Sequence, residues 1–307
     1  MKEKVIVLMS TYNGMAHLQE QIDSIFSQSY DGEIEIFSRD DGSADDTVSF
    51  LEKYPQTDLR KIVVQQGKNV GPQKSFLKLI KNAGNADYYF FADQDDVWLS
   101  DKIERGVSSL RNEKKAAVYC SNYTVTDESL NVKDEAFIKE TPLFTPIKTL
   151  LYNQVPGCCM AFNKSMMDLL KQVDVDNVMM HDSMLLSLAS YVGTVKYDCQ
   201  PSILHRIHGN NVVGAGHKKI VPHKWIAEKI RLLVKKEPYD ISELADQFIR
   251  LNACEKQSVF QKDVELLRDY KRNYKKTVQL LRHPDSHDIP WDRTTLSIRC
   301  KILFHLF

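Results

Sequence analysis

Three carboxylates follow a run of aromatic and apolar residues in the first third of the chain. The run, Tyr88–Ala92, is short and unbroken, as expected of a buried strand, and it leads directly into Asp93, Asp95 and Asp96. Because like charges this close repel one another, we expect a divalent cation and a diphosphate to complete the group. Mg²⁺ and Mn²⁺ bind a few carboxylate oxygens together with water and phosphate oxygens, so Asp93 and Asp95 are predicted metal ligands. An ordinary acidic turn is the alternative, and the position at a strand end favours the metal site.

Two further polar clusters also follow predicted strands. The sequence STYNG, residues 10–14, follows the apolar run 5–9, and RDDGS, residues 39–43, follows the run 33–37. In parallel α/β sheets, ligands bind beyond the carboxyl ends of the strands. We therefore expect these two clusters and the three carboxylates to line one binding site.

The residue types in these clusters suit a nucleotide. Asp41 is predicted to accept a hydrogen bond from the imide N–H of a pyrimidine base, Tyr12 to stack on that base, and Ser10 and Thr11 to shape its pocket. The alternative for residues 39–43 is a turn that leads into a helix cap. Neither GxGxxG nor GxxxxGKS or GxxxxGKT occurs, which argues against a dinucleotide dehydrogenase and against a P-loop NTPase.

The elements that must position these residues alternate between strand and helix up to about residue 92. Such alternation predicts an α/β fold with a mainly parallel sheet and right-handed crossovers. Ser43 followed by Asp46 resembles a capping box, which predicts a helix that opens there and runs through Leu51. The predicted strands are 5–9, 33–37, 61–65 and 88–92, and the predicted helices are 18–26, 43–51 and 71–84.

Later in the chain the order of elements is looser. Strands are predicted at 116–120, 157–162 and 194–198, and a helix at 181–193. From Pro222 to Arg282 the pattern is helical, and the long stretch 242–282 contains no Gly or Pro. We place a domain boundary near residue 217.

Size and composition indicate a globular protein. The chain has 307 residues, of which 43% are hydrophobic and 27% charged, and this length suggests one large domain or one domain with an appendage. Its six cysteines form no CxxC pair, so neither a disulfide framework nor a zinc knuckle is expected. Because no apolar run reaches about 18 residues and the N-terminus does not resemble a signal, we expect a cytoplasmic protein.

Six stretches, in the same order as those of a known family, extend over residues 3–216. They are VIVLMSTYNG, RDDGSADDT, NVGPQKSF, FADQDDVWLSDKI, HDSMLL and LHRIHGNNVVG. With these stretches the chain resembles glycosyltransferase family 2, whose members have the GT-A fold and transfer sugars from nucleotide donors with inversion. The stretches DQDDVW, HD and HGNNVVG are most similar to rhamnosyltransferases that build bacterial cell-wall and capsular polysaccharides.

The resemblance implies roles for residues in two of these motifs. In DQDD, Asp95 would bind Mn²⁺ or Mg²⁺, and Asp93 would lie near the donor ribose or a metal-bound water. In HD, Asp182 would be the general base that takes the proton of the acceptor hydroxyl, and His181 would orient Asp182 or pack beside it. The two residues after HD are not the bulky aromatic residues common in the family, so the resemblance does not identify the acceptor.

The resemblance also implies that four further residues lie in the donor site. His208, in HGNN, would approach the metal ion or the diphosphate, and Arg206 would pair with phosphate oxygens. Asn69 and Lys74 would line the donor pocket. His205 receives no assigned role.

The implied reaction is a single displacement, for which positions 41, 95, 182 and 208 must converge on one cleft. The acceptor hydroxyl attacks the anomeric carbon opposite the nucleoside diphosphate. From dTDP-β-L-rhamnose this gives an α-L-rhamnosyl linkage to a saccharide or a lipid-linked saccharide. The alternatives are a UDP-sugar donor, a sugar nucleotidyltransferase that releases pyrophosphate, and a non-catalytic nucleotide-sugar-binding protein.

The resemblance also suggests a division of the chain. Residues 1–216 would form the GT-A catalytic domain, with a nucleotide-sugar-binding half at 1–110 and an acceptor and catalytic-base half at 111–216. Residues 217–307 would form a helical extension with 19 Lys and Arg against 12 Asp and Glu, a net charge of +7 that leaves −7 on residues 1–216. We expect no nucleic acid partner.

The end of the chain, residues 294–307, combines apolar side chains with Arg299 and Lys301. As a helix it is too short to span a membrane, and one interpretation places it in the anionic interface at the inner face of the plasma membrane. A closing helix packed on the catalytic domain is the alternative. The basic helices before it would form a homodimer contact or an acceptor platform.

Overall fold

The computed structural model describes residues 2–174, 180–207, 239–251, 258–287 and 293–307. The chain divides into two compact units, each assembled from separated segments. The sheet unit consists of Met1–Pro142, Gln154–Val175 and Gly193–Asn211. The helical unit consists of Leu143–Asn153, Asp176–Val192 and Val212–Phe307. The domain boundary predicted near residue 217, and the two halves predicted before it, stay predictions.

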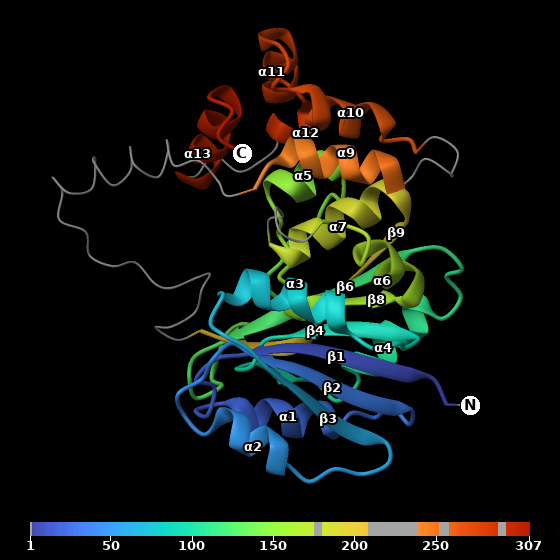
Figure 1. Ribbon diagram of the computed structural model, residues 1–307, viewed down its shortest axis with the longest axis vertical. Coiled ribbons are helices and arrows are strands. Elements are labelled where there is room, and N and C mark those ends of the chain that lie inside the picture. The colour runs from blue at the N-terminus through green and yellow to red at the C-terminus, as the bar shows by residue number, and fades with distance from the viewer. Residues whose placement is uncertain (1, 175–179, 208–238, 252–257, 288–292) are drawn as a thin grey trace, which may run out of the picture. The chain divides into compact units, whose positions relative to one another are not determined.

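The strands of the sheet unit form one mixed sheet. They are β1 Lys4–Thr11, β2 Glu33–Asp40, β3 Arg60–Gln66, β4 Tyr88–Ala92, β5 Val97–Trp98, β6 Ala117–Thr126, β7 Val132–Asp134, β8 Met160–Asn163 and β9 Thr194–Arg206. Within the described residues the order is β3-β2-β1-β4-β8-β6-β9-β5, with β7 paired to β6 (Figure 1). The first four strands are parallel to one another, and β8 joins them to β6 by antiparallel pairing. The predicted α/β architecture is therefore confirmed.

The four strands predicted in the first 92 residues are all present. The apolar runs in β1 and β4 are fully covered, because helices lie on both faces of a parallel sheet. β2 continues beyond its predicted end at Phe37 to Asp40, and all of its last four residues are buried. The extension brings Arg39 and Asp40 into the sheet as polar residues at its carboxyl end.

The helices between these strands lie on both faces of the sheet. They are α1 Leu18–Phe26, α2 Thr47–Lys53 and α3 Pro72–Asn82. Figure 1 shows α1 and α2 on one face and α3 on the other. The chain moves from β1 to β2 and β3 in one direction and then returns past β1 to β4, so right-handed crossovers place α3 on the opposite face. On the α3 face, the rings of Phe91 and Phe76 meet edge to face with centroids 5.6 Å apart. On the other face, Phe90 meets Trp98 at 5.8 Å.

The strand register brings the predicted polar clusters to one edge. Thr11 lies opposite Asp40 across β1 and β2, and Met9 lies opposite Ala92 across β1 and β4. Residues 10–14, 39–43 and 93–96 therefore leave the sheet at nearly the same level, as the sequence predicted.

Several further predicted boundaries are wrong, and the strand predicted at 194–198 continues as β9 to Arg206. The capping box at Ser43 does not form, because its hydroxyl donates to Asp40, and α2 begins only at Thr47. The strand predicted at 157–162 begins with a 3₁₀ turn, η1 Gly157–Cys159, before β8. The third predicted helix ends at Asn82 rather than Gly84, because Ala83 adopts ψ 137° and leaves the helical region.

Two helices of the sheet unit follow the carboxylates and β8. They are α4 Lys102–Leu110 and α6 Lys164–Leu170. Gly106 allows α4 to approach the sheet closely, since a Cβ there would lie 2.7 Å from the Phe90 ring. Asn163 begins α6 by accepting a hydrogen bond from the Met166 amide.

The helical unit contains short helices around an apolar core. They are α5 Pro146–Leu151, α7 His181–Val192, α9 Ile241–Leu251, α10 Gln261–Asp269, α11 Tyr274–Leu281, α12 Pro284–His287 and α13 Arg293–Leu303. Its buried side chains include Ile147, Leu185, Leu188, Phe248 and Leu267. The predicted helical stretch 242–282 is thus divided, and Asn273 starts α11 by accepting a hydrogen bond from the Lys276 amide at 3.0 Å. Among the described helices, none is long and apolar enough to cross a membrane.

The C-terminal segment packs within the helical unit. Ile302 of α13 and Phe307 are buried, whereas Phe304 is 60% exposed. His305 Nε2 lies 2.9 Å from Thr277 Oγ1. The predicted contact of this segment with a membrane interface stays a prediction.

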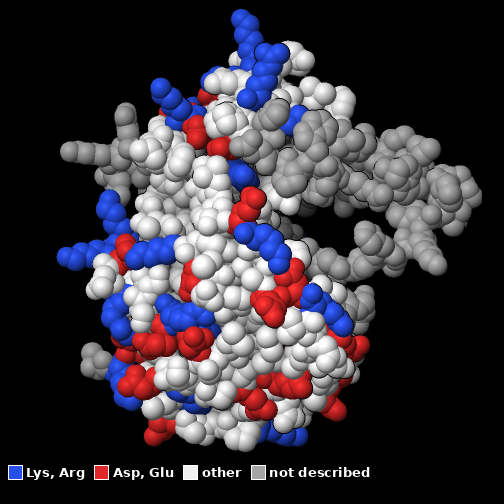
Figure 2. Space-filling view, turned by 180° about the vertical axis from the view of Figure 1, so that it is seen from behind, with Lys and Arg blue, Asp and Glu red and all other residues white. Residues whose placement is uncertain are grey.

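Charges of both signs are interspersed over the described part of the face drawn in Figure 2. Within the sheet unit, ion pairs join distant parts of the chain, such as Arg105 with Asp198 at 2.6 Å and Arg111 with Glu3 at 2.9 Å. Residues 217–238, which contribute to the excess of Lys and Arg over Asp and Glu in residues 217–307, lie outside the described residues.

Candidate active site

Asp40 organises the turn that follows β2. Its Oδ1 accepts hydrogen bonds from the amides of Gly42 at 3.0 Å and Ser43 at 2.8 Å, and its Oδ2 accepts from the Ser43 hydroxyl at 2.5 Å. Thr11 Oγ1 also donates to Oδ2 at 3.2 Å, which ties β1 to this turn. Gly42 has φ +86°, and a side chain there would press on the Asn69 amide at 3.2 Å. The turn proposed as the alternative for residues 39–43 is therefore present, and Asp40 holds it.

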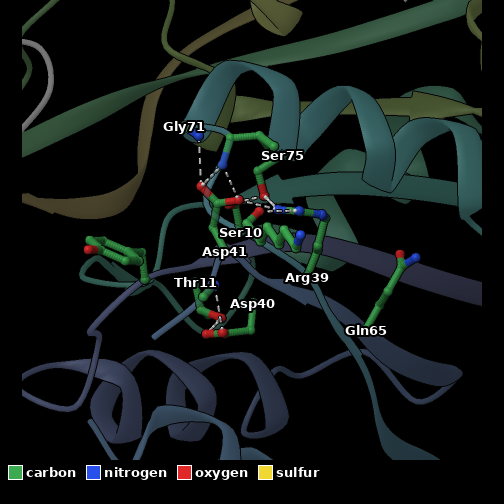
Figure 3. A network of polar contacts seen from close by, with 12 residues as sticks. Ser10, Thr11, Arg39, Asp40, Asp41, Gln65, Gly71 and Ser75 are labelled. Carbon is green, nitrogen blue, oxygen red and sulfur yellow. Dashed lines mark hydrogen bonds and ion pairs between the residues drawn. The ribbon is translucent and has the colours of Figure 1, made fainter. Parts of the chain in front are cut away.

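Asp41 is held by a second set of donors on the opposite side of this turn. Its carboxylate is 3% exposed and lies 2.5 Å from the Arg39 guanidinium. The amides of Val70 and Gly71 donate to it at 2.8 to 3.0 Å. Figure 3 shows this carboxylate between Arg39 and the backbone that leads into α3. The Asp41 side chain is thus fixed before any ligand arrives.

Arg39 links Asp41 to the start of α3 and to β1. Its Nη1 donates to Ser75 Oγ at 3.0 Å, and its Nη2 donates to the Lys68 carbonyl at 3.1 Å. Ser10 Oγ in turn donates to Ser75 Oγ at 2.6 Å. Ser10 and Asp41, which the sequence predicted to share a pocket, therefore belong to one hydrogen-bond network (Figure 3).

Gln94 joins the loop after β4 to the loop after β1. Its Oε1 accepts from the Tyr12 amide at 2.9 Å, and its Nε2 donates to the Tyr12 carbonyl at 3.1 Å. Gln21 Nε2 also donates to the Asp93 carbonyl at 2.9 Å. With its backbone fixed in this way, Tyr12 keeps a side chain that is 48% exposed, as a stacking platform needs.

The other two residues predicted for the donor pocket lie near α3. Asn69 is exposed in the loop before the helix, and Lys74 is exposed in its first turn. Both side chains face solvent, while their neighbour Gly71 bonds to Asp41. Their predicted contact with the donor stays a prediction.

Four side chains from three parts of the sheet unit meet beyond β4. One potential ligand atom from each of Asp93, Asp96, Cys158 and His205 lies within 4.8 Å of the others. Asp93 and Asp96 belong to the loop between β4 and β5, and His205 comes from β9, which pairs with β5. Cys158 comes from η1, which leads into β8 beside β4.

Asp96 is the member of this cluster with no exposed surface. Its Oδ1 lies 2.8 Å from His205 Nδ1 and accepts from the Arg206 amide at 3.3 Å. Its Oδ2 is buried without a hydrogen-bond partner among the described residues. A buried carboxylate oxygen in this state is costly unless a ligand or a cation pairs with it.

The electrostatics of the cluster follow from its burial and its crowding. Burial, together with the charges of Asp96 and Asp95, raises the pKa of Asp93 to about 7. Burial acts to lower the pKa of His205, but the Asp96 carboxylate outweighs it and raises that pKa to about 9. The cluster therefore retains protons that a divalent cation would displace.

Asp95 and Arg206 meet beside this cluster. Asp95 is half-buried, and its carbonyl accepts from Arg206 Nε at 2.9 Å. The Arg206 guanidinium is buried and also donates to the Glu128 carbonyl and to the Glu20 carboxylate, the latter at 2.5 Å. Arg206 thus supports the carboxylate loop, and its predicted pairing with phosphate oxygens stays a prediction.

The predicted catalytic base lies in the helical unit. Asp182 is half-buried in the first turn of α7, and its Oδ1 accepts from the Ser183 amide at 2.7 Å. His181 is buried beside it, and burial lowers the pKa of its imidazole to about 4, so the ring is neutral near pH 7. His208 lies outside the described residues. The expected convergence of positions 41, 95, 182 and 208 therefore stays a prediction.

Sequence reasoning missed part of the cluster. Asp96 was part of the quoted motif but received no individual role, and His205 received none. Cys158 entered only as one of six cysteines without a CxxC pair. The signal for Asp96 was its place directly after Asp95 at the strand end. His205 and Cys158 come from other strands, and only the pairing of β9 with β5 and of β8 with β4 brings them there.

Comparisons with known proteins identify related sequences. Residues 6–172 match the model of the family described as glycosyl transferase family 2. Over 243 residues the chain is 31% identical to dTDP-rhamnosyl transferase RfbG of Shigella flexneri, which covers 72% of this chain and 82% of that protein.

Two solved structures have a similar fold. One is S. aureus TarS 1–349 in complex with UDP-GlcNAc, with a TM-score of 0.56 and 13% identity over 98% of this chain and 81% of that one. The other is the mannosyltransferase PcManGT from Pyrobaculum calidifontis in complex with GDP-Man and Mn²⁺, with a TM-score of 0.51 and 15% identity over 99% and 86%. At these identities the likeness concerns the fold alone, and it confirms the predicted GT-A architecture.

Proposed function

The chain belongs to glycosyltransferase family 2, and from this premise we propose that it transfers L-rhamnose from dTDP-β-L-rhamnose to a hydroxyl of a saccharide acceptor. The observation that carries the donor is the 31% identity to the S. flexneri dTDP-rhamnosyl transferase. The acceptor would be a saccharide or a lipid-linked saccharide of a cell-wall or capsular polysaccharide.

We propose that the donor nucleotide binds at the carboxyl ends of β1 and β2. Asp41 would accept the imide N–H of the pyrimidine, and its fixed position supports this role because a preorganised acceptor loses little freedom on binding. Tyr12 would stack on the base from its exposed position, with Ser10 and Thr11 at the side of the pocket. Asn69 and Lys74 would contact the donor from the start of α3.

The carboxylates after β4 fit a divalent cation. The unpaired, buried Oδ2 of Asp96 and the raised pKa of Asp93 both indicate negative charge that a cation would compensate. Mn²⁺ or Mg²⁺ would be held by Asp93, Asp95 and Asp96, with His208 as a further ligand or diphosphate contact on the resemblance alone. When bound, the ion would supply Lewis-acid stabilisation of the charge on the departing diphosphate.

We propose Asp182 as the general base. Its carboxylate would take the proton of the acceptor hydroxyl while that oxygen attacks the anomeric carbon. The nucleoside diphosphate would leave from the opposite face, so that one displacement inverts the configuration and no covalent enzyme intermediate forms. Arg206 would add positive charge near the phosphates.

A UDP-sugar donor is the second candidate. It is favoured by the similarity of fold to S. aureus TarS 1–349, whose structure contains UDP-GlcNAc. The two candidates share the reaction and the site and differ only in the contacts to the base and the sugar.

The test is a donor panel in which the released nucleotide is identified by chromatography. dTDP-β-L-rhamnose, UDP-glucose and UDP-GlcNAc would be incubated with Mn²⁺ or with EDTA, with and without an extract of bacterial membrane lipids as acceptor. We expect dTDP to form from the rhamnose donor, only with Mn²⁺, and faster with the extract. UDP release alone would move the assignment to the second candidate, and dTTP formation on addition of pyrophosphate would indicate a nucleotidyltransferase.

A further inference from the structure

Cys158 is a buried thiol that the proposed reaction does not use. It is 1% exposed and lies in η1, where the chain turns into β8. Its Sγ lies within the 4.8 Å group formed with ligand atoms of Asp93, Asp96 and His205. The sulfur therefore lies beside the carboxylates, at the edge of the buried core.

A second observation points independently to a ligand at the same place. The Oδ2 atom of Asp96 is buried without a partner among the described residues, while Oδ1 is already engaged by His205 and by a backbone amide. The neighbouring amino group of Lys102 is committed elsewhere, to the Cys158 carbonyl at 2.9 Å and to Ser202 at 3.1 Å. Within the described part of the chain, the carboxylate therefore has one oxygen left for a cation.

The donor types in this group differ from those of a magnesium site. Mg²⁺ prefers oxygen ligands. A site that adds a thiolate and an imidazole to carboxylates favours Mn²⁺, Co²⁺ or Zn²⁺, and the affinity of these ions for nitrogen and sulfur ligands increases in that order. Sulfur contributes most to the discrimination because it is the softest of these ligands.

We infer that Cys158 is a ligand of the bound divalent cation, so that the carboxylate cluster forms a mixed oxygen, nitrogen and sulfur site that selects Co²⁺ and Zn²⁺ over Mg²⁺. The inference rests on the metal dependence in the proposed function and deepens it. On ligation the sulfur–hydrogen bond is replaced by a sulfur–metal bond, and the proton passes to solvent. No electron is transferred.

The test is the absorption spectrum of the protein with Co²⁺. Metal-free protein would be titrated with Co²⁺ in the presence of dTDP and, separately, of UDP. We expect a near-ultraviolet thiolate-to-cobalt charge-transfer band that saturates at one ion per chain. Cys158→Ser should lose this band, and Cys199→Ser, which changes an exposed cysteine of the same unit, should retain it.

Selectivity provides a readout that does not depend on the spectrum. At equal concentrations, Zn²⁺ and Co²⁺ should raise the melting temperature of the wild type more than Mg²⁺ does, and Cys158→Ser should remove most of that difference. If circular dichroism shows that Cys158→Ser is unfolded, X-ray absorption at the cobalt edge of the unmodified protein replaces the variant. A sulfur neighbour is then the expected result.

Several outcomes would overturn the inference. These are cobalt binding without a charge-transfer band, a band that persists in Cys158→Ser, only oxygen and nitrogen neighbours at the cobalt edge, or no cobalt binding with either nucleotide. The proposed transferase function would survive the first three if Mn²⁺-dependent release of dTDP or UDP is observed. It would fail separately if no donor is turned over with any metal.

Discussion

The Asp96–His205 pair should make the stability of the metal-free sheet unit depend on pH. The folded-state pKa of His205 is raised to about 9 from an ordinary value of 6.5, so the folded protein binds this proton more tightly than the unfolded chain. The stabilisation is therefore fully present below about pH 6.5 and is lost as the pH rises through about 9. We expect the free energy of unfolding, measured by urea denaturation in EDTA, to decrease as the pH rises from about 6.5 to about 9.

Substitution of the partner carboxylate isolates this effect. Asp96→Asn removes the charge that holds the His205 proton, so its stability should change much less over the same pH range. Asp168→Asn, which alters an exposed carboxylate whose ion-pair partner among the described residues is Lys164, should keep the wild-type slope. Equal slopes in the wild type and Asp96→Asn would contradict the pairing as the cause.

At the residue scale, the sequence predicted which side chains could form a site better than it predicted the groups that those side chains contact. Asp93 could be placed at a strand end because it directly follows an apolar run, and Asp41 because it comes shortly after the predicted strand 33–37. The bonds of Asp41 to Arg39 and to the amides before α3 could not be predicted, because they depend on where the next loop packs. His205 is 109 residues away from Asp96 along the chain, and only strand pairing makes them neighbours.

Asn163 connects three elements of the sheet unit and should be costly to replace. Its Oδ1 accepts from the Met166 amide at the start of α6 and from the Ala117 amide at the start of β6, each at 3.1 Å. Its Nδ2 donates to the Lys115 carbonyl at 2.7 Å. Asn163→Ala removes a helix cap and leaves buried groups unpaired, so we expect a loss of about 2 to 4 kcal/mol in the free energy of unfolding, measured by urea denaturation.

A matched pair of variants separates the cap from the other bonds. Asn163→Ser retains a cap oxygen but lacks the amide that bonds the backbone before β6, so its stability should lie between those of the wild type and Asn163→Ala. Asn273→Ala removes the cap of α11, where the side chain is exposed, and should cost only about 1 kcal/mol. Equal losses for Asn163→Ala and Asn273→Ala would show that the connection to β6 contributes nothing.

The sequence predicted strands more accurately than helix starts. β1 and β4 appear as continuous apolar runs because both faces of the sheet are covered, and this signal is strong. The start of α2 was misplaced because Ser43 has two competing partners, a helix amide and the Asp40 carboxylate. The sequence cannot rank these partners, since the carboxylate is positioned by β2 and by Thr11.

For the whole molecule, the two compact units should respond differently to the donor nucleotide. Every described residue proposed to bind the donor or the metal lies in the sheet unit, whereas Asp182 lies in the helical unit. In scanning calorimetry we expect dTDP with Mn²⁺ to raise the transition of the sheet unit, by about 2.7 kcal/mol of stabilisation at 100 times the dissociation constant. Asp182→Asn should show the same rise and yet lose turnover by at least about 100-fold.

The opposite result has a clear meaning. If Asp182→Asn weakens dTDP binding as much as it slows turnover, Asp182 contributes to the donor site and is not simply a base. Asp168→Asn serves as the control and should match the wild type in both measurements.

The assignment of separate chain segments to the two compact units could not be predicted from local sequence patterns. The local pattern changes near residue 217, yet the segments 143–153 and 176–192 cluster with the C-terminal helices by contact. Such membership depends on tertiary packing, for example the hydrogen bond between Thr145 and Asp285, and no local pattern encodes it. Homodimer formation, contact with a membrane interface and the acceptor platform remain predictions for residues 217–307.

The central claim is that the residues at the carboxyl ends of β1, β2 and β4 form a metal-dependent site for a nucleoside diphosphate. Calorimetric titration of the wild type with dTDP, in Mn²⁺ and then in EDTA, tests it most directly. We predict at least about tenfold tighter binding with Mn²⁺, a difference of about 1.4 kcal/mol, and loss of that difference in Asp95→Asn. Equal affinity in Mn²⁺ and EDTA, or no binding of either dTDP or UDP, would contradict the claim.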